Sequence, residues 1–151
     1  MPNSQHIADE LQYLIQICRD GEHRYRDGAE HVKNRELKRV LNEISLERAK
    51  FAVDLEREAV RWGKPDVDSH GTMYGVVHRG WAELKAGLGG SDDAILASME
   101  QGDEYAMRYY DEAIQDDQTP AEVVGVLRNQ AQAIVGTLDR IRALRRNRQA
   151  A

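Results

Sequence analysis

Cysteine and proline are scarce in this 151-residue chain, and long apolar runs are missing altogether. The single cysteine, Cys18, cannot form an intramolecular disulfide or a cysteine-based metal cluster. No run of about 18 or more apolar residues is present, so we expect no membrane insertion. Three prolines and 12 glycines are too few for a fibrous or low-complexity chain. These absences leave a globular domain as the expected class.

The charge balance is mildly acidic, and no targeting segment is visible. Lys and Arg number 21 and Asp and Glu 26, which gives a formal net charge of -5. Because nucleic acids are themselves strongly anionic, we expect no nucleic-acid partner. The segment from Met1 to Ile15 lacks the basic stretch followed by an apolar stretch that marks a secretory signal. A cytoplasmic location is therefore the expectation.

Apolar residues recur every three or four positions along four long segments, which predicts helices. The four stripes lie within residues 7–29, 37–62, 95–113 and 123–141. A shorter stripe from Met73 to Leu88 predicts one extra helix. No segment alternates apolar and polar residues as a strand does. The sequence therefore predicts an all-α fold, an antiparallel four-helix bundle with one extra short helix between the second and third long helices, and a single domain over residues 1–151.

Capping residues mark the starts of these helices. Asn34 and Ser91 precede the second and third long helices, and such side chains accept hydrogen bonds from amides of the first turn. The segment Thr119 to Glu122 predicts a capping box at the last helix, with Pro120 at the first helical position.

Polar residues interrupt the apolar stripes at matching positions. Glu22 and Glu47 fill gaps in the first two stripes, and an alignment of the two halves of the chain pairs them with Asp103 and Gln130. A carboxylate in an apolar seam is costly unless it is paired, protonated or bound to a metal. In di-metal bundles, two helices each supply a Glu and the other two each supply a Glu-x-x-His pair. Duplicated hairpins of this kind are typical of a ferritin-like bundle. Glu22, Glu47, Asp103 and Gln130 are therefore the candidate metal ligands.

The imidazole ligands of such a centre are missing. No Glu-x-x-His occurs, and the positions expected for histidine hold Lys50 and Ala133. We therefore expect a vestigial site with no resident cofactor, or with iron or manganese at low occupancy. In one alternative, the polar residues and Lys50 form a buried network without a metal. In another, the stripes are offset by one position and some of the polar residues face water.

Several short segments resemble one bacterial family. They are Cys18 to Glu22, Glu36 to Ala49, His78 to Trp81 and Asp139 to Leu144. Together they are similar to a ferritin-like four-helix-bundle family of unknown function, distantly related to rubrerythrins and stress-induced ferritin-like proteins. The resemblance implies an up-down bundle, a bacterial source, a cytoplasmic location and no assigned activity. Members of that family carry a histidine near position 138, where this chain has Leu138.

The expected function is a non-catalytic, stress-related or protein-association role. Trp62, Trp81 and Leu88 are the candidate surface for a homodimer, because the short helix lies at the edge of a four-helix core. The sequence does not identify any other protein partner. The alternative is a carboxylate-bridged di-metal oxidase, peroxidase or metal-binding protein. The missing Glu-x-x-His motifs favour the non-catalytic interpretation over an enzyme.

Overall fold

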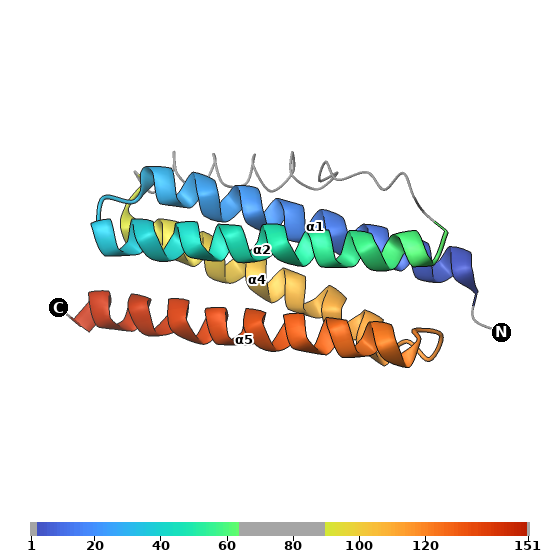
Figure 1. The fold of residues 1–151 in the computed structure, drawn as a ribbon. Coiled ribbons are helices and arrows are strands. Elements are labelled where there is room, and N and C mark those ends of the chain that lie inside the picture. The colour runs from blue at the N-terminus through green and yellow to red at the C-terminus, as the bar shows by residue number, and fades with distance from the viewer. Residues whose placement is uncertain (1–2, 64–89, 151) are drawn as a thin grey trace.

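The computed structural model describes residues 3–63 and 90–150, and four helices make up this part of the chain (Figure 1). They are α1 (Ser4–His31), α2 (Arg35–Arg61), α4 (Asp92–Gln115) and α5 (Ala121–Ala150). No strand occurs among the described residues, so the all-α prediction and the four long helices are confirmed there. None of these helices is apolar enough over its length to cross a membrane. The short helix predicted from Met73 to Leu88 lies outside the described residues.

Capping side chains determine where three of the helices begin. Asn3, Asn34 and Ser91 each accept a hydrogen bond from an amide of the first turn, at 3.2, 3.0 and 3.1 Å. The capping box predicted at Thr119 is wrong. The Thr119 hydroxyl instead lies 2.8 Å from the carbonyl oxygen of Ala113 and 2.9 Å from a carboxylate oxygen of Glu10. This threonine therefore connects the turn before α5 to α1.

Contacts at the two ends of the bundle fix the directions of the helices. At one end, the amides of Lys33 and Asn34 donate to Asp92 at the start of α4, at 2.8 and 3.1 Å. At the other end, His6 near the start of α1 lies 2.6 Å from Asp116, which follows α4. α1 is therefore antiparallel to α4 as well as to α2. As a result, α2 and α4 run in the same direction (Figure 1).

The helix order is that of a crossover bundle. The chain leaves one end of the bundle at Gly63 and resumes at the opposite end at Gly90 (Figure 1). The helix pairs in contact, α1–α2, α1–α4, α4–α5 and α2–α5, are each antiparallel. The up-down order that the resemblance implies is not the one observed. Helical periodicity does not distinguish the up-down order from the crossover order, because a helix has the same apolar stripe whichever way it runs in the bundle.

The core consists of two apolar clusters that follow one another along the bundle axis. One cluster includes Leu14 and Leu55, and the other includes Leu41 and Ile95. Between them lies a polar layer that is almost completely excluded from solvent. Its members are Asp20, Arg24, Arg48 and Asp103, which are 3, 6, 2 and 0 % exposed. The centre of the bundle is therefore polar, near the level at which polar residues interrupt the sequence stripes.

Candidate functional site

An ion-pair cluster around Asp103 occupies the polar layer. One carboxylate oxygen, Oδ1, accepts from Arg48 at 2.7 Å and from Arg24 at 2.9 Å. The other, Oδ2, accepts from Arg48 at 3.0 Å and from the Tyr25 hydroxyl at 2.5 Å. Arg24 and Tyr25 come from α1, Arg48 from α2 and Asp103 from α4. Three helices therefore converge on one carboxylate.

The positive charges of Arg24 and Arg48 stabilise the ionised form of Asp103. Burial alone would raise the pKa of the Asp103 carboxyl, but the charges of Arg48 and Arg24 outweigh burial and hold that pKa below its usual value. Asp103 is therefore ionised. Burial raises the pKa of the neighbouring Tyr25 hydroxyl well above its ordinary value, and the charge of Asp103 adds to the effect. Tyr25 consequently remains protonated and donates to the carboxylate.

Asp20 is the second carboxylate of the polar layer. It is 3 % exposed, and neither of its side-chain oxygens has a hydrogen-bond partner among the described residues. Burial raises the pKa of Asp20 to about 7, although the charge of Arg24, one turn further along α1, opposes the shift. A buried carboxylate without hydrogen bonds is costly, so ionisation of Asp20 destabilises the folded state.

A glycine faces each of the two arginines. A Cβ atom at Gly102 would overlap the guanidinium group of Arg24, and one at Gly21 would lie 3.4 Å from an Nη atom of Arg48. The two glycines occupy equivalent positions in the internal repeat of the sequence. Gly102 therefore lets Arg24 lie directly against the backbone of α4, whereas a Cβ atom at Gly21 would make an ordinary van der Waals contact with Arg48.

Of the four predicted metal ligands, Asp103 and Gln130 are buried. Asp103 is the centre of the ion-pair cluster. Gln130 accepts from the Tyr110 hydroxyl at 2.7 Å and donates to the carbonyl oxygen of Phe51 at 3.3 Å. Tyr110 follows Asp103 by two helical turns, about 10 Å along the axis of α4. Gln130 therefore lies at a different level of the bundle from Asp103.

The other two predicted ligands, Glu22 and Glu47, are half-buried. Glu22 pairs with Arg19 at 3.3 Å, and Arg19 also reaches Glu56 at 3.1 Å. Lys50, the cation expected near the site, is exposed. Within the described part of the chain, the predicted carboxylates do not come close enough together to share one ion.

The residues around Asp103 fit an ion-pair cluster and do not fit a metal centre. Its two oxygens already accept four hydrogen bonds, three of them from positively charged groups. Arg24 and Arg48 supply the positive charge that a metal ion would supply, and they would repel such an ion. Metal binding by Glu22, Glu47, Asp103 and Gln130 stays a prediction.

Sequence reasoning missed Arg48 because it assigned the neighbouring Glu47 to the stripe, and it missed Arg24 because Tyr25 beside it is also buried. Gly21, and not Glu22, continues the buried face of α1, and Arg48, and not Glu47, continues that of α2. On these two helices the stripe is offset by one position, as one of the alternatives allowed. The available signal was Gly102, because a glycine inside a helical stripe indicates close approach of another group, here Arg24.

A buried chain of polar side chains connects α1, α4 and α5 two turns away from Asp103. The sulfur of Cys18 lies 3.0 Å from the hydroxyl of Tyr110, which in turn donates to Gln130. Burial raises the pKa of the Cys18 thiol to about 11, and the contact with Tyr110 offsets only part of that shift. Cys18 is therefore a protonated core residue, which does not favour a redox or nucleophilic role.

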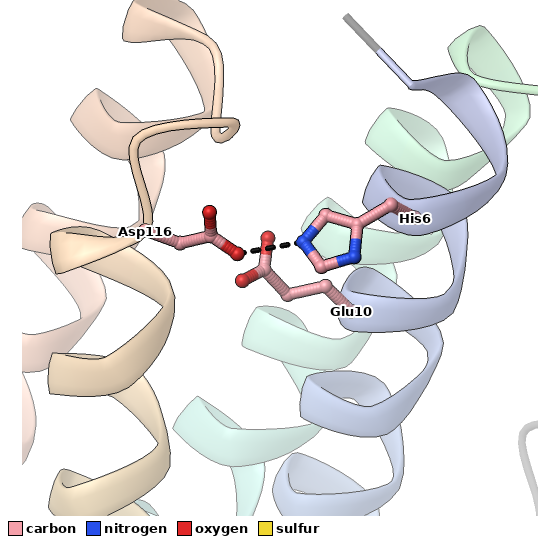
Figure 2. Close-up of side chains that lie close together, drawn as sticks. All are labelled: His6, Glu10 and Asp116. Atoms are coloured by element: carbon pink, nitrogen blue, oxygen red, sulfur yellow. Dashed lines mark hydrogen bonds and ion pairs between the residues drawn. The ribbon is translucent and has the colours of Figure 1, made fainter.

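A third polar cluster lies at the end of the bundle where α1 begins and α4 ends (Figure 2). It consists of His6, Glu10 and Asp116, each of which is half-buried. One ligand atom from each of the three side chains lies within 4.8 Å of the other two. Within the described part of the chain, these three residues could therefore hold one metal ion together.

Gly102→Ala should destabilise the protein, although alanine usually stabilises a helix interior by about 0.5–1 kcal/mol relative to glycine. The new methyl group would displace Arg24 from Asp103. Gly136→Ala in α5 is the matched control, because a Cβ atom there meets nothing within 4 Å. Thermal unfolding should show a lower midpoint for Gly102→Ala and a higher one for Gly136→Ala. A higher midpoint in both variants would show that Arg24 can move without cost.

The stability of the protein should depend on pH through Asp20. Its pKa is about 7 when folded against an ordinary value of 3.8, so the folded state holds this proton more tightly than the unfolded state. The contribution of Asp20 to the unfolding free energy therefore decreases as pH rises from about 4 to about 7. Asp20→Asn should be more stable than wild type at pH 8, by at most about 4 kcal/mol, and the gain should vanish near pH 4. Urea unfolding at both pH values measures this, and a gain that does not change with pH would contradict the ionisation.

The comparison with known families identifies the chain. A family described as a domain of unknown function, DUF2383, matches residues 6–116. The matched range includes the ion-pair cluster and all three residues of the cluster at the end of the bundle. No curated protein matches the chain. Because the match covers most of the sequence, the chain belongs to the family of the DUF2383 domain of unknown function.

Proposed function

We propose that this protein is a ferritin-like bundle with an ion-pair cluster in place of a central metal site, and that it acts without catalysis, through association with a second copy of the chain. The observation that carries the proposal is the engagement of Asp103 by Arg24, Arg48 and Tyr25. A central carboxylate that is already neutralised by the protein's own cations has no need of iron or manganese. Residues 1–151 would form one domain, and the protein would be bacterial and cytoplasmic.

The helix order supports the ferritin-like part of the proposal. Ferritin-like folds contain one long crossover connection, whereas simple up-down bundles have only short loops. In this protein α2 and α4 run in the same direction, and the chain changes ends between Gly63 and Gly90 (Figure 1). The crossover is a feature of the backbone, so it supports the assignment independently of the short segments that resemble the ferritin-like family.

An exposed apolar stripe on α2 supports the association. Leu46, Val53 and Val60 are 72, 37 and 56 % exposed and recur every seven residues. This spacing is the one at which two helices pack along a common seam. Trp62 follows the stripe and packs partly against the core, while Trp81 and Leu88 lie outside the described residues. The proposed homodimer surface is this stripe together with the three predicted residues. The stress-related role has no comparable support in a surface feature.

Sedimentation velocity tests the association. Wild-type protein should form dimers as its concentration rises. Leu46→Glu with Val53→Glu should stay monomeric, because two charges would be buried in the apolar seam. Val135→Glu is the matched control, since Val135 is also exposed, at 43 %, but lies on α5. It should dimerise as wild type does. A wild-type protein that is monomeric up to about 1 mM, where an interaction is worth only about 4 kcal/mol, would overturn the association.

Metal analysis tests the metal-free core. Protein from cells grown with iron and manganese should have the same metal content in wild type and in the double variant Glu22→Gln with Glu47→Gln. The di-metal alternative predicts about two ions per chain that are lost in the double variant. That result would overturn the metal-free core and support the enzyme alternative.

A further inference from the structure

We propose that His6, Glu10 and Asp116 bind one divalent transition-metal ion at the end of the bundle (Figure 2). The three residues are separate from the ion-pair cluster around Asp103. The inference therefore goes beyond the proposed function and does not depend on it.

The three side chains converge because of where α1 and α4 place them. His6 and Glu10 are four residues apart on α1, and residues at this spacing lie one above the other on the same helix face. Asp116 faces them from the end of α4, and its Oδ2 atom lies 2.6 Å from Nε2 of His6. Figure 2 shows the imidazole and both carboxylates directed into the same space. The three ligand atoms lie within 4.8 Å of one another.

These separations are close to those around a bound ion. Ligand atoms about 2.0–2.2 Å from a zinc ion in tetrahedral geometry lie roughly 3.4 Å from each other. Binding would widen the 2.6 Å contact between His6 and Asp116 to about this separation through rotation of their half-buried side chains. The ion would then occupy the place of the hydrogen bond between His6 and Asp116.

Neighbouring groups hold the two carboxylates in place. Oδ1 of Asp116 accepts from the amide of Gln118 at 2.9 Å, while Oδ2 faces His6. Oε2 of Glu10 accepts from the hydroxyl of Thr119 at 2.9 Å, and this contact orients the carboxylate. Outer contacts of this kind orient the ligands of protein metal sites.

The charge of the cluster calls for a cation. With a neutral imidazole, the two carboxylates give the cluster a charge of -2, and the ion pair that the described residues provide for Asp116 is the one with His6. Burial raises the pKa of Glu10, and the nearby charge of Asp116 raises it further. The hydrogen bond from His6 lowers the pKa of Asp116. A divalent ion bound between the two carboxylates would remove the repulsion between their charges.

The donor set determines the class of ion. One imidazole nitrogen with two carboxylate oxygens suits zinc, manganese or iron(II), whereas calcium and magnesium sites use oxygen ligands throughout. The side chains of His6 and Asp116 are 39 and 22 % exposed, so water can complete the coordination. The bound ion would connect the start of α1 to the end of α4.

Zinc titration of the untagged full-length protein, after treatment with a chelator, tests the site. Calorimetry should show one equivalent of Zn²⁺, and Zn²⁺ should raise the midpoint of thermal unfolding, because the three ligands come together only in the folded state. His6→Gln, Glu10→Gln and Asp116→Asn should each weaken binding at least about tenfold. Asp117→Asn is the matched control in the same turn, and its affinity should stay within about twofold of wild type, since Asp117 is exposed.

The variants are chosen to keep the fold. Asn at position 116 still accepts from the amide of Gln118, and Gln at position 10 still accepts from Thr119. Circular dichroism verifies their helix content. Binding that does not saturate below about 1 mM Zn²⁺, or that is equal in wild type and in the three variants, would overturn the site and leave the metal-free core intact. Binding that survives His6→Gln but is lost in Glu22→Gln with Glu47→Gln would overturn both.

Discussion

The pairing of Asp103 with Arg24 and Arg48 is the interaction on which the centre of this bundle depends. The carboxylate is completely buried, and the two guanidinium groups reach it from two other helices. A buried ion pair adds little net stability over a well-packed apolar core, but the loss of one partner costs about 3–5 kcal/mol because a charge is left unpaired in the interior. A shift of any one of α1, α2 and α4 along its axis would separate a guanidinium group from the carboxylate. We therefore interpret the cluster as the feature that sets the register of these helices, while the two apolar clusters on either side supply most of the favourable burial.

Carboxylates that are wholly or partly shielded from water lie both at the centre and at the end of the bundle, and different groups balance their negative charge at the two places. At the centre, the chain provides its own cations, and Asp103 remains ionised despite its burial. At the end, Glu10 and Asp116 lie together beside the imidazole of His6, which pairs with Asp116 at 2.6 Å. A carboxylate that is already neutralised by arginine repels a metal ion, whereas a pair of carboxylates without arginine attracts one. This contrast is why the metal site that we propose lies at the end of the bundle and not in its middle.

The acidic residues of the internal repeat predict a shared metal site, but in the structure the repeat instead places glycines opposite arginines. The repeat pairs Gly21 with Gly102, and each glycine faces an arginine of an adjacent helix, although only at Gly102 would a Cβ atom overlap it. The acidic residues that follow them have different environments, since Glu22 is half-buried beside Arg19 and Asp103 is the fully buried centre of the cluster. Similar helices can therefore carry the same local pattern while different residues of that pattern point inward.

The sequence by itself determined the four long helices, their capping residues at Asn34 and Ser91, and the presence of polar side chains near the middle of the bundle. These features depend on local periodicity and on hydrogen bonds within a single turn. Only the tertiary structure decided that Arg48 and not Glu47 faces the core, that α2 and α4 run in the same direction, and that His6 meets Asp116. A helix has 3.6 residues per turn, so a stripe can continue by three or by four residues, and the choice between neighbours depends on what the facing helix presents. Contacts between residues far apart in the chain exist only after the helices have packed.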